Sequence, residues 1–318
     1  MAALDQPLVS LPAAPGASGG PAPAVGWVTR LGAWSDRNAS WLFPLPGLAA
    51  VLALMGYPIG YTVYLSFQKW FVSSIQPPTW VGLQNYALLF RDERFLAAVW
   101  HTAVFTLVAL VVQTVLGVGM ALIFNEEFKG RGMVRTLFLL PMAATPVAIA
   151  LVWMMLLDPG IGLINWLLKT VYLPQPLWTG SERLVLITLA LVDTWQWTPL
   201  VMLIVLAGLA ALPKDPYDAA LVDGANAWQT FWFITLPLLR PSIMVACLFR
   251  LIDALKTFDI IYIITGGGPA WASETLNIFA FNQGFVYFHM GYTSAVLVLF
   301  LALILAMSLV LIRLRRAA

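Results

Sequence analysis

The sequence has few charged residues, one cysteine and two histidines. Charged residues make up 10% of its 318 residues, whereas a soluble protein carries about 25%. Cys247 is alone, so no disulfide can form within the chain. His101 and His289 lack ligand spacing, which argues against a zinc site. No G-x-x-x-x-G-K-[ST] motif occurs, so the chain does not carry its own P-loop ATPase. The net charge of +2 gives little support for nucleic acid binding.

Apolar residues are what the chain has in excess, at 61% of the sequence. A membrane-spanning helix needs about 20 mostly apolar residues to cross about 30 Å of hydrocarbon. The pattern predicts an all-α integral membrane protein with six spans, near 41–67, 100–124, 134–157, 184–212, 239–264 and 290–312. The first span contains Pro58 and Gly60, which predicts a tilt or a kink.

Residues 1–40 differ from everything that follows. The stretch "LPAAPGASGGPAPAVG" (11–26) is rich in Ala, Pro and Gly, which predicts a disordered tail. It lacks the charged start and the continuous apolar region of a signal peptide, so we expect the first span to be retained. The predicted organisation is therefore a tail, 1–40, and a six-helix membrane domain, 41–318.

The basic residues between the spans indicate the orientation. One set of connections holds ten of them: Arg30, Arg37, Lys129, Arg131, Arg135, Lys214, Arg240, Arg313, Arg315 and Arg316. The other set holds five: Lys69, Arg91, Arg94, Lys169 and Arg183. The positive-inside rule places the first set in the cytoplasm, together with both termini and the connection between spans four and five.

That cytoplasmic connection, about 213–238, is patterned rather than plainly polar. "LPKDPYDAALVDGANAWQTF" (212–231) predicts a helix capped by Asp215, with Pro216 at its first position. Five residues at helical spacing would share one face of it: Tyr217, Ala220, Leu221, Gly224 and Trp228. Asp218 and Asp223 would disfavour an anionic lipid surface, so a docking helix for a protein partner fits better than one resting on lipid.

The same connection resembles a known signature. Its spacing is D-A-A, three residues, Gly, nine residues and I-x-L-P, met by Asp218, Ala219, Ala220, Gly224, Ile234, Leu236 and Pro237. It is similar to the "EAA" motif of permease subunits of binding-protein-dependent ABC importers, with Asp218 where the family usually has Glu. The resemblance extends over about residues 41–312.

The resemblance implies the type I ABC importer permease fold, in a multi-pass subunit of the bacterial inner membrane. It also implies that the motif segment is a coupling helix. Asp218, Ala219, Ala220, Gly224, Leu236 and Pro237 would then contact a separate ATPase subunit. A second homologous permease, two ATPase subunits and an extracytoplasmic sugar-binding protein would complete the transporter. The subunit itself would hold no cofactor or metal and would have no catalytic residue.

Charged residues also occur inside the predicted spans. Each is costly in lipid, by about 2.5–3.5 kcal/mol at a helix centre, so each is expected to face protein or a water-filled path. Arg250, Asp253, Lys256 and Asp259 alternate in sign at steps of three, where helical neighbours can pair. For Lys256 and Asp259 a structural ion pair is the favoured interpretation. Gly266 to Pro269 predicts an external turn rather than a phosphate loop.

Two clusters are expected near mid-membrane, one on each side of the motif segment. Asp193 lies nine residues into span four, about 14 Å deep, and Arg250 eleven residues into span five, about 17 Å deep. Carboxylate, amide, guanidinium and indole groups suit a polyhydroxylated ligand. In sugar permeases that resemble this chain, the corresponding places line the substrate path. They hold Asp193, Gln196, Trp197, Arg250, Asp253 and Ala254.

The leading prediction is a permease subunit that forms half of the path of an ATP-driven importer for a mono-, di- or oligosaccharide or a sugar alcohol. The run "FRLIDALKTFDIIYIITGGGP" (249–269) resembles the carbohydrate subgroup. One alternative is an importer of glycerol-phosphate-type substrates, although Asp193 and Asp253 would repel a phosphate. Another is an ion-coupled secondary transporter, in which membrane carboxylates bind the ion. A membrane enzyme is disfavoured because no nucleophile–base or metal constellation appears.

Overall fold

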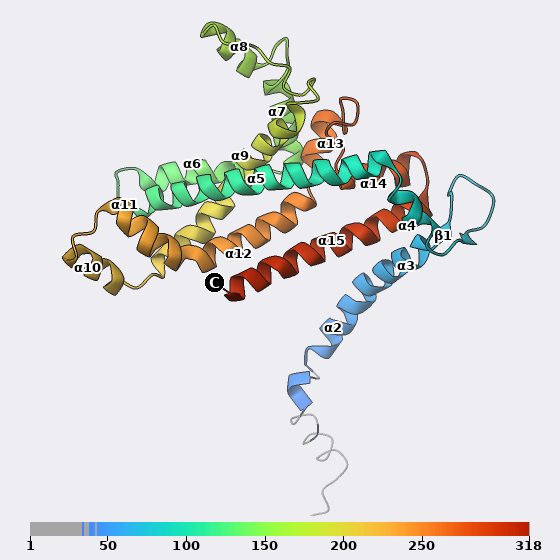
Figure 1. Cartoon of the computed structure of the whole chain (residues 1–318), viewed down its shortest axis with the longest axis horizontal. Coiled ribbons are helices and arrows are strands. Elements are labelled where there is room, and N and C mark those ends of the chain that lie inside the picture. The colour runs from blue at the N-terminus through green and yellow to red at the C-terminus, as the bar shows by residue number, and fades with distance from the viewer. Residues whose placement is uncertain (1–33, 35–37, 42, 318) are drawn as a thin grey trace, which may run out of the picture. The chain divides into compact units, whose positions relative to one another are not determined.

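Long apolar runs become long helices in the computed structural model (Figure 1), which describes residues 34, 38–41 and 43–317. The predicted tail, 1–40, lies outside these residues except for 34 and 38–40, so its disorder stays a prediction. The chain divides into two units, Met1–Ile59 and Gly60–Ala318.

The first unit holds α2 (Leu45–Val51), the π-helical turn η1 (Leu52–Gly56) and the start of α3 (Tyr57–Ser66). These elements belong to the first candidate span, Asn38–Ser66. The sequence predicts a tilt or kink in the span that contains Pro58 and Gly60, and the π-turn ends two residues before Pro58. No residue of α2 is buried, which suits a helix surrounded by lipid or by another subunit.

The second unit begins with the rest of α3, which a group of short elements follows. A two-residue antiparallel ladder pairs β1 (Gln68–Lys69) with β2 (Thr79–Trp80), and α4 (Gln84–Leu89) follows. The Asp92 side chain then caps the long helix α5 (Glu93–Asn125) by accepting from the backbone N–H groups of Arg94 and Phe95. At 33 residues α5 is about 50 Å long, so it extends beyond the hydrocarbon core.

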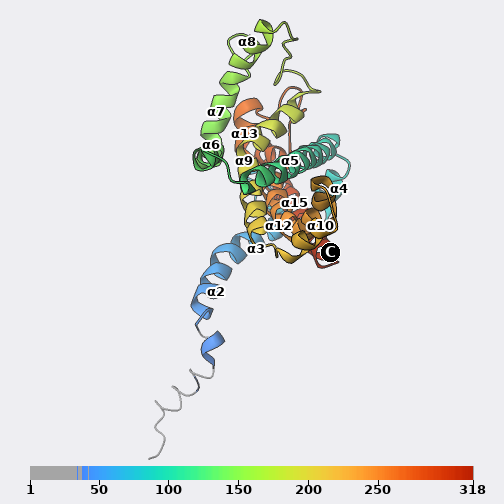
Figure 2. The same cartoon turned by 90° about the vertical axis from the view of Figure 1, so that its left-hand side faces the viewer.

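The third predicted span is broken. Helices α6 (Arg131–Ala143) and α7 (Pro146–Leu156) meet at an angle of 99°. Pro146 stands at the start of α7, where its missing N–H costs nothing, and the Thr145 hydroxyl accepts from the Ala148 N–H. Figure 2 shows α6 nearly end-on while α7 leads away from it towards α8 (Leu163–Thr170). The single span 134–157 is therefore a bent helix pair.

Span four is α9 (Val185–Ala210), close to its predicted range. The connection after it contains α10 (Asp215–Val222) and α11 (Ala227–Thr230), and the π-turn η2 (Phe231–Thr235) joins α11 to α12 (Leu236–Leu255). Span five thus runs from 227 to 255 rather than from 239 to 264. The remaining elements are α13 (Asp259–Thr265), α14 (Leu276–Phe281), η3 (Asn282–Val286) and α15 (Met290–Ala317).

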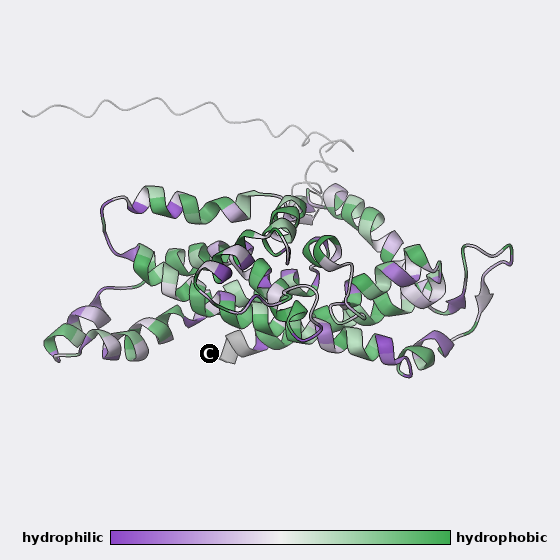
Figure 3. Cartoon of the chain, turned by 90° about the horizontal axis from the view of Figure 1, so that it is seen from above, coloured by the Kyte–Doolittle hydropathy of each residue, from purple (hydrophilic) through white to green (hydrophobic). Residues whose placement is uncertain are grey.

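Within the described residues, five helices are long and apolar enough to span a membrane, or six if the α6–α7 pair counts as one. Apolar residues dominate these helices, and polar residues gather in their connections (Figure 3). The buried core forms three clusters, and α5 contributes to each. Gly117 lets α5 approach α9 closely, because a Cβ there would lie 2.6 Å from Val201 Cγ1. The helical membrane fold predicted from the sequence is confirmed.

Candidate functional site

A cavity of about 280 Å³ lies where α9 and α12 meet the link to α13. Four of the six predicted substrate-path residues line it: Asp193 and Trp197 from α9, and Arg250 and Asp253 from α12. The remaining lining comes from Pro146, Lys256, Thr257, Phe258, Asp259 and Ile260. The structure therefore brings together side chains from two helices that the sequence separates by more than fifty residues.

Asp193 and Arg250 form a buried ion pair at the base of this cavity. Arg250 Nη2 lies 2.8 Å from Asp193 Oδ2, and each side chain is 1% exposed. Gln113 of α5 completes the arrangement: its Nε2 donates to Asp193 Oδ2 at 2.8 Å, and its Oε1 accepts from Arg250 Nε at 2.7 Å. Charges in a low-dielectric interior are tolerated when they are paired and hydrogen-bonded in this way.

Two atoms of the pair have hydrogen-bonding capacity to spare. Asp193 Oδ1 and Arg250 Nη1 are buried and have no hydrogen-bond partner among the described residues. Arg250 Nη1 lies 3.7 Å from Asp253 Oδ2, in ion-pair range but beyond a hydrogen bond. Buried polar atoms are nearly always satisfied in folded proteins. An unpaired acceptor beside an unpaired donor is thus a feature that a hydroxylated ligand could complete.

The other polar groups of the cavity surround this pair. The Arg250 guanidinium lies 5.1 Å from the centre of the Trp197 ring, in range for a cation–π contact. The Asp253 side chain is 44% exposed and also lies 3.9 Å from Lys256 Nζ. The site therefore presents an indole, a carboxylate and an ammonium around a buried ion pair.

Gln196 and Ala254 lie elsewhere. The Gln196 side chain is buried and donates to the Ala144 carbonyl at 3.3 Å, at the break between α6 and α7. Its amide thus satisfies a carbonyl that the bend removes from regular helical bonding. Ala254 is 2% exposed and does not line the cavity.

The expected pairing of Lys256 with Asp259 is wrong. α12 ends at Leu255 with Lys256 as its C-cap, and α13 begins at Asp259, so the two residues do not share a helix. Lys256 approaches Asp253 instead. Of the predicted pairs between residues three apart, two are confirmed: Arg250 with Asp253, and Asp253 with Lys256.

Sequence reasoning missed Gln113, which is fully buried on α5. Its signal was present: one amide stands in the apolar run "VALVVQTVLG" (108–117). A lone amide in a span is expected to face a polar partner, since lipid offers no hydrogen bond. Its partners lie 80 and 137 residues away, so the sequence alone did not identify them.

The motif segment consists of two helices rather than one. Asp215 is the first residue of α10, and Lys214 takes the N-cap position without a side-chain bond, so the capping prediction is wrong. Gly224 adopts φ of +73°, which ends the helical path. Asn226 then starts α11 through a capping box with Gln229. Consequently Tyr217, Ala220 and Leu221 do not share one helix face with Gly224 and Trp228.

The segment exposes much of its apolar surface. Asp218 and Ala219 are exposed on α10, and Ala220 is buried. The large exposed side chains nearby are Leu221, Val222, Trp228, Trp232 and Phe233. Leu236 and Pro237 lie in the first turn of α12. Trp228, Trp232 and Phe233 belong to the candidate span Ala227–Leu255, so Leu221 and Val222 are the large exposed apolar side chains outside it. Exposed apolar side chains beside carboxylates such as Asp218 are typical of a protein-docking surface.

Comparison with known proteins gives a consistent result. The family model "Binding-protein-dependent transport system inner membrane component" matches residues 113–317. A probable ABC transporter permease of Sinorhizobium fredii is 39% identical over 87% of this chain and 90% of its own length. The trehalose/maltose transport system permease MalF of Thermococcus litoralis is 36% identical over 89% and 95%.

A solved structure shares the fold. It belongs to a bacterial ABC transporter involved in the import of the acidic polysaccharide alginate, and its TM-score is 0.77. The identity is 23%, and the match covers 91% of this chain and 99% of that one. The type I importer permease fold that the motif implies is thereby confirmed.

Proposed function

The chain belongs to the family of inner membrane components of binding-protein-dependent transport systems, and on that premise we propose that it is the permease subunit of an ATP-driven sugar importer. It forms half of the translocation path and performs no chemistry itself. A second, homologous permease supplies the other half. Two ATPase subunits and an extracytoplasmic sugar-binding protein complete the transporter.

The observation that carries the sugar assignment is the buried Asp193–Arg250 pair with its two unpaired atoms. Asp193 Oδ1 can accept a hydrogen bond from one hydroxyl group, and Arg250 Nη1 can donate to a neighbouring one. Adjacent hydroxyls of a sugar ring present this combination. The Trp197 ring provides an apolar face for the C–H surface of the same ring.

The charges favour a neutral saccharide over a phosphorylated substrate. Arg250 would attract a phosphate, but it is already paired with Asp193 and lies beside Asp253. Two carboxylates near the site oppose a dianion through like-charge repulsion. The Thermococcus litoralis relative is named for trehalose and maltose, which are neutral disaccharides.

In the proposed mechanism, the motif segment transmits ATP binding to the path. Asp218 and Ala219 are exposed on α10, and Gly224 forms the bend to α11, so this surface can contact an ATPase subunit. The segment then lies in the cytoplasm, as do both termini, in agreement with the distribution of basic residues. The ATPases bias an equilibrium between outward-open and inward-open states of the permease pair.

Reconstituted uptake tests this proposal. Proteoliposomes holding the complete transporter would be given labelled neutral sugars, sugar alcohols and glycerol 3-phosphate, with ATP or with an ion gradient alone. We expect ATP-dependent uptake of a neutral sugar. Uptake driven by an ion gradient without ATPase subunits would contradict the importer, and preference for glycerol 3-phosphate would contradict the neutral substrate.

The path assignment needs its own variants. Asp193→Ala and Arg250→Ala should each lower sugar uptake at least about tenfold while the subunits still assemble, since each removes a direct ligand contact. Phe249→Ala is the matched control, because Phe249 neighbours Arg250 and is 56% exposed on the outer face of α12. Normal uptake by both Asp193→Ala and Arg250→Ala would contradict the assignment of these residues to the substrate path.

A further inference from the structure

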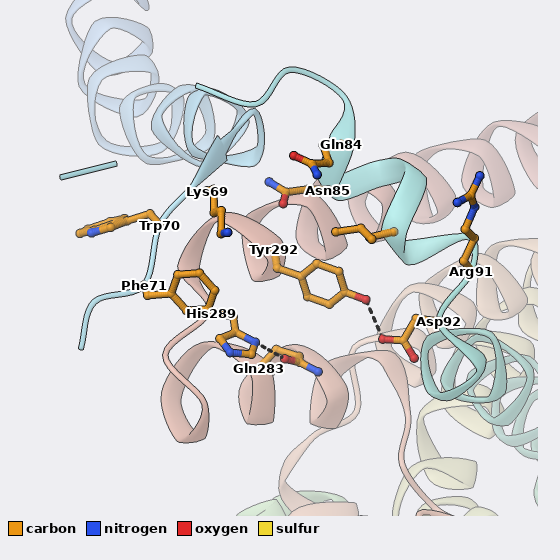
Figure 4. A pocket seen from close by; sticks show the side chains of 11 residues that line it. Lys69, Trp70, Phe71, Gln84, Asn85, Arg91, Asp92, Gln283, His289 and Tyr292 are labelled. Atoms are coloured by element: carbon orange, nitrogen blue, oxygen red, sulfur yellow. Dashed lines mark hydrogen bonds between the residues drawn. The ribbon is translucent and has the colours of Figure 1, made fainter. Parts of the chain in front are cut away.

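A second and larger cavity, of about 530 Å³, lies beside α4 and the start of α15 (Figure 4). Figure 1 shows these elements at the end of the helical domain opposite α10 and α11 of the motif segment. It is formed by the β1 region, α4, the start of α5, η3 and the start of α15. Its lining residues are Lys69, Trp70, Phe71, Gln84, Asn85, Leu88, Arg91, Asp92, Gln283, His289 and Tyr292. It shares no lining residue with the cavity beside Asp193. The volume is within the range of small-molecule sites.

The frame of this cavity is fixed by hydrogen bonds. The buried Asn85 side chain donates from Nδ2 to the carbonyls of Ser66 and Gln68, at 2.8 and 2.9 Å. Gly291 packs so tightly against Gln68 that a Cβ would lie 1.8 Å from the Gln68 carbonyl oxygen. These contacts attach β1 to both α4 and α15. The walls are therefore preformed rather than assembled from loose loops.

The one carboxylate of the lining is fully engaged. Asp92 Oδ1 accepts from the N–H groups of Arg94 and Phe95, and Asp92 Oδ2 accepts from the Tyr292 hydroxyl at 2.6 Å. Lys69 and Arg91 have no ion-pair partner among the described residues. Figure 4 shows them on opposite sides of the cavity. Lys69 Nζ lies 5.9 Å from the centre of the Phe71 ring, in range for a cation–π contact. The two positively charged donors of the lining therefore have no carboxylate partner within the described part of the chain.

The cavity is also lined by aromatic rings and by side-chain amides. The Phe71 and His289 rings meet edge to face with centres 4.8 Å apart, and the Tyr292 ring lies beside them in Figure 4. Partial burial lowers the pKa of the His289 imidazole below its usual value, which favours the neutral ring. His289 Nδ1 and Gln283 Oε1 are 3.0 Å apart, within hydrogen-bonding distance, so the other ring nitrogen, Nε2, remains for a ligand.

From these groups we propose that this cavity is an outer saccharide subsite, which binds a hydroxylated ring at the extracytoplasmic end of the subunit before the ring reaches the path beside Asp193. Phe71 and Tyr292 cover the apolar face of the ring. Gln84, the Gln283 amide and His289 Nε2 exchange hydrogen bonds with its hydroxyls, and Lys69 and Arg91 donate to hydroxyl oxygens at either side. The inference rests on the proposed function, since it assumes that the transported substrate is a sugar.

A phospholipid headgroup is the competing occupant, because two cations near a membrane boundary attract phosphate. The observations favour a sugar. The cations lie on opposite sides rather than converging on one point, and the surface between them consists of amides and aromatic rings. A phosphate is best held by converging donors, whereas amides alternating with aromatic faces match a ring that carries several hydroxyls.

Equilibrium binding and uptake by the complete transporter in nanodiscs test the inference, with labelled maltose and trehalose as probes. Phe71→Ala and Gln84→Ala change the outer cavity without touching its frame. Ile75→Ala and Gln76→Ala are matched controls, because both residues lie in the loop between β1 and β2 and do not line the cavity. Each cavity variant should weaken binding at the outer subsite about fivefold to tenfold, as expected for loss of one stacking or hydrogen-bond contact.

The outcomes separate the inference from the function on which it rests. We expect a raised KM for uptake with an unchanged maximal rate in Phe71→Ala and Gln84→Ala, and a lowered maximal rate in Asp193→Ala. If both cavity variants import with the parent KM, or if mass spectrometry finds a phospholipid retained by the parent and lost in Phe71→Ala, the outer subsite is overturned and the importer stands. If the parent neither binds nor imports any sugar, the proposed function itself fails.

Discussion

Gln113 on α5 and Asp193 on α9 are joined by a hydrogen bond of 2.8 Å across 80 residues of sequence. The same amide accepts from Arg250 of α12, so one neutral side chain connects both members of a buried ion pair. Three helices are therefore attached to each other at one point inside the membrane part of the molecule. The geometry of the pair depends on this third residue as much as on the two charges.

Replacing Gln113 should weaken that attachment. Gln113→Leu removes the amide N–H that donates to Asp193 and the amide oxygen that accepts from Arg250. Each buried charged group then loses one hydrogen bond. We expect destabilisation of about 1–3 kcal/mol and reduced sugar uptake. Thermal unfolding of the purified transporter measures the first effect. Val111→Leu, on the exposed face of the same helix, is the control. An unchanged melting temperature in Gln113→Leu would show that the amide does not hold the pair.

The ion pair itself should show strong coupling. Removing Arg250 alone leaves Asp193 buried without its counter-ion, and the reverse change leaves the guanidinium unpaired, so each single alanine variant should cost about 3–5 kcal/mol. The double variant should cost clearly less than the sum, because no unpaired charge remains. A double-mutant cycle on unfolding free energies measures this coupling.

Uptake by the double variant then separates stability from transport. If the pair were only structural, the double variant would regain uptake along with its stability. We expect recovered stability without recovered uptake, because the two unpaired atoms that we propose bind the sugar, Asp193 Oδ1 and Arg250 Nη1, are both missing.

Gly224 should be required because of its backbone conformation, and not because a side chain at this position would clash with other residues of this chain. Its φ is +73°, and a Cβ built on it would meet nothing within 4 Å. Gly224→Val should therefore cost about 1–2 kcal/mol and impair coupling, whereas Gly224→Asn should be tolerated better, because Asn adopts this conformation more readily. ATPase activity stimulated by the binding protein is the measurement. Gly119→Ala, at an open helical position, is the control.

Comparable losses in Gly224→Asn and Gly224→Val would carry a different meaning. They would indicate that the partner subunit approaches the glycine too closely for any side chain. Pull-down of the ATPase subunits by each variant distinguishes a lost contact from a contact that forms but does not transmit.

Arg94 should not be replaceable by lysine. Its Nε and Nη2 donate to the two carboxylate oxygens of Glu274 at 2.5 and 2.6 Å, and the Glu274 side chain is 1% exposed. The guanidinium also stacks 4.7 Å from the Trp271 ring. A lysine keeps the charge but loses the bidentate geometry and the stacking, so Arg94→Lys should lower stability by about 1–3 kcal/mol.

Arg91→Lys provides the comparison for this change. Arg91 is exposed and has no ion-pair partner among the described residues, so thermal unfolding of Arg91→Lys should match the parent. Equal melting temperatures for Arg91→Lys and Arg94→Lys would contradict the stabilising role assigned to the bidentate Arg94–Glu274 pair.

The sequence predicted the helices well and their interruptions poorly. The fifth span was expected to start after Pro237, because proline usually ends a helix. In the structure Pro237 lies in the first turn of α12. The π-turn η2 connects α11 to α12, so the helical path continues through the proline. At the other end, "DIIYIIT" (259–265) continues the apolar run, yet a helix break at Lys256 separates it from α12. Hydropathy indicates which segments are buried in lipid or protein, but it does not indicate where a helix bends or breaks.

The candidate site was partly predictable for a similar reason. Charged residues in apolar runs are conspicuous, so Asp193 and Arg250 were found from their cost in lipid. Depth along each helix then placed them at one level. Which side chains face each other depends on helix rotation and packing, and neither Gln113 nor the true partner of Lys256 could be inferred from spacing.

The outer cavity shows the same limit more strongly. Its lining comes from segments near 69–71, 84–92 and 283–292, and no motif links them. The close packing of Gly291 against Gln68 and the backbone bond from Gly291 N–H to the Trp70 carbonyl bring the first and last of these segments together, and the bond from Tyr292 to Asp92 joins the last to the second.

By itself, then, the sequence determined the membrane class, the approximate spans and the family, because hydropathy and the seven-position motif are local properties of the chain. The tertiary structure alone decided the bent third span, the two-helix form of the motif segment, the Gln113–Asp193–Arg250 network and the outer cavity. Those features depend on contacts between residues far apart in sequence. Such contacts are set by packing and by the need to satisfy buried polar groups, which no local pattern records.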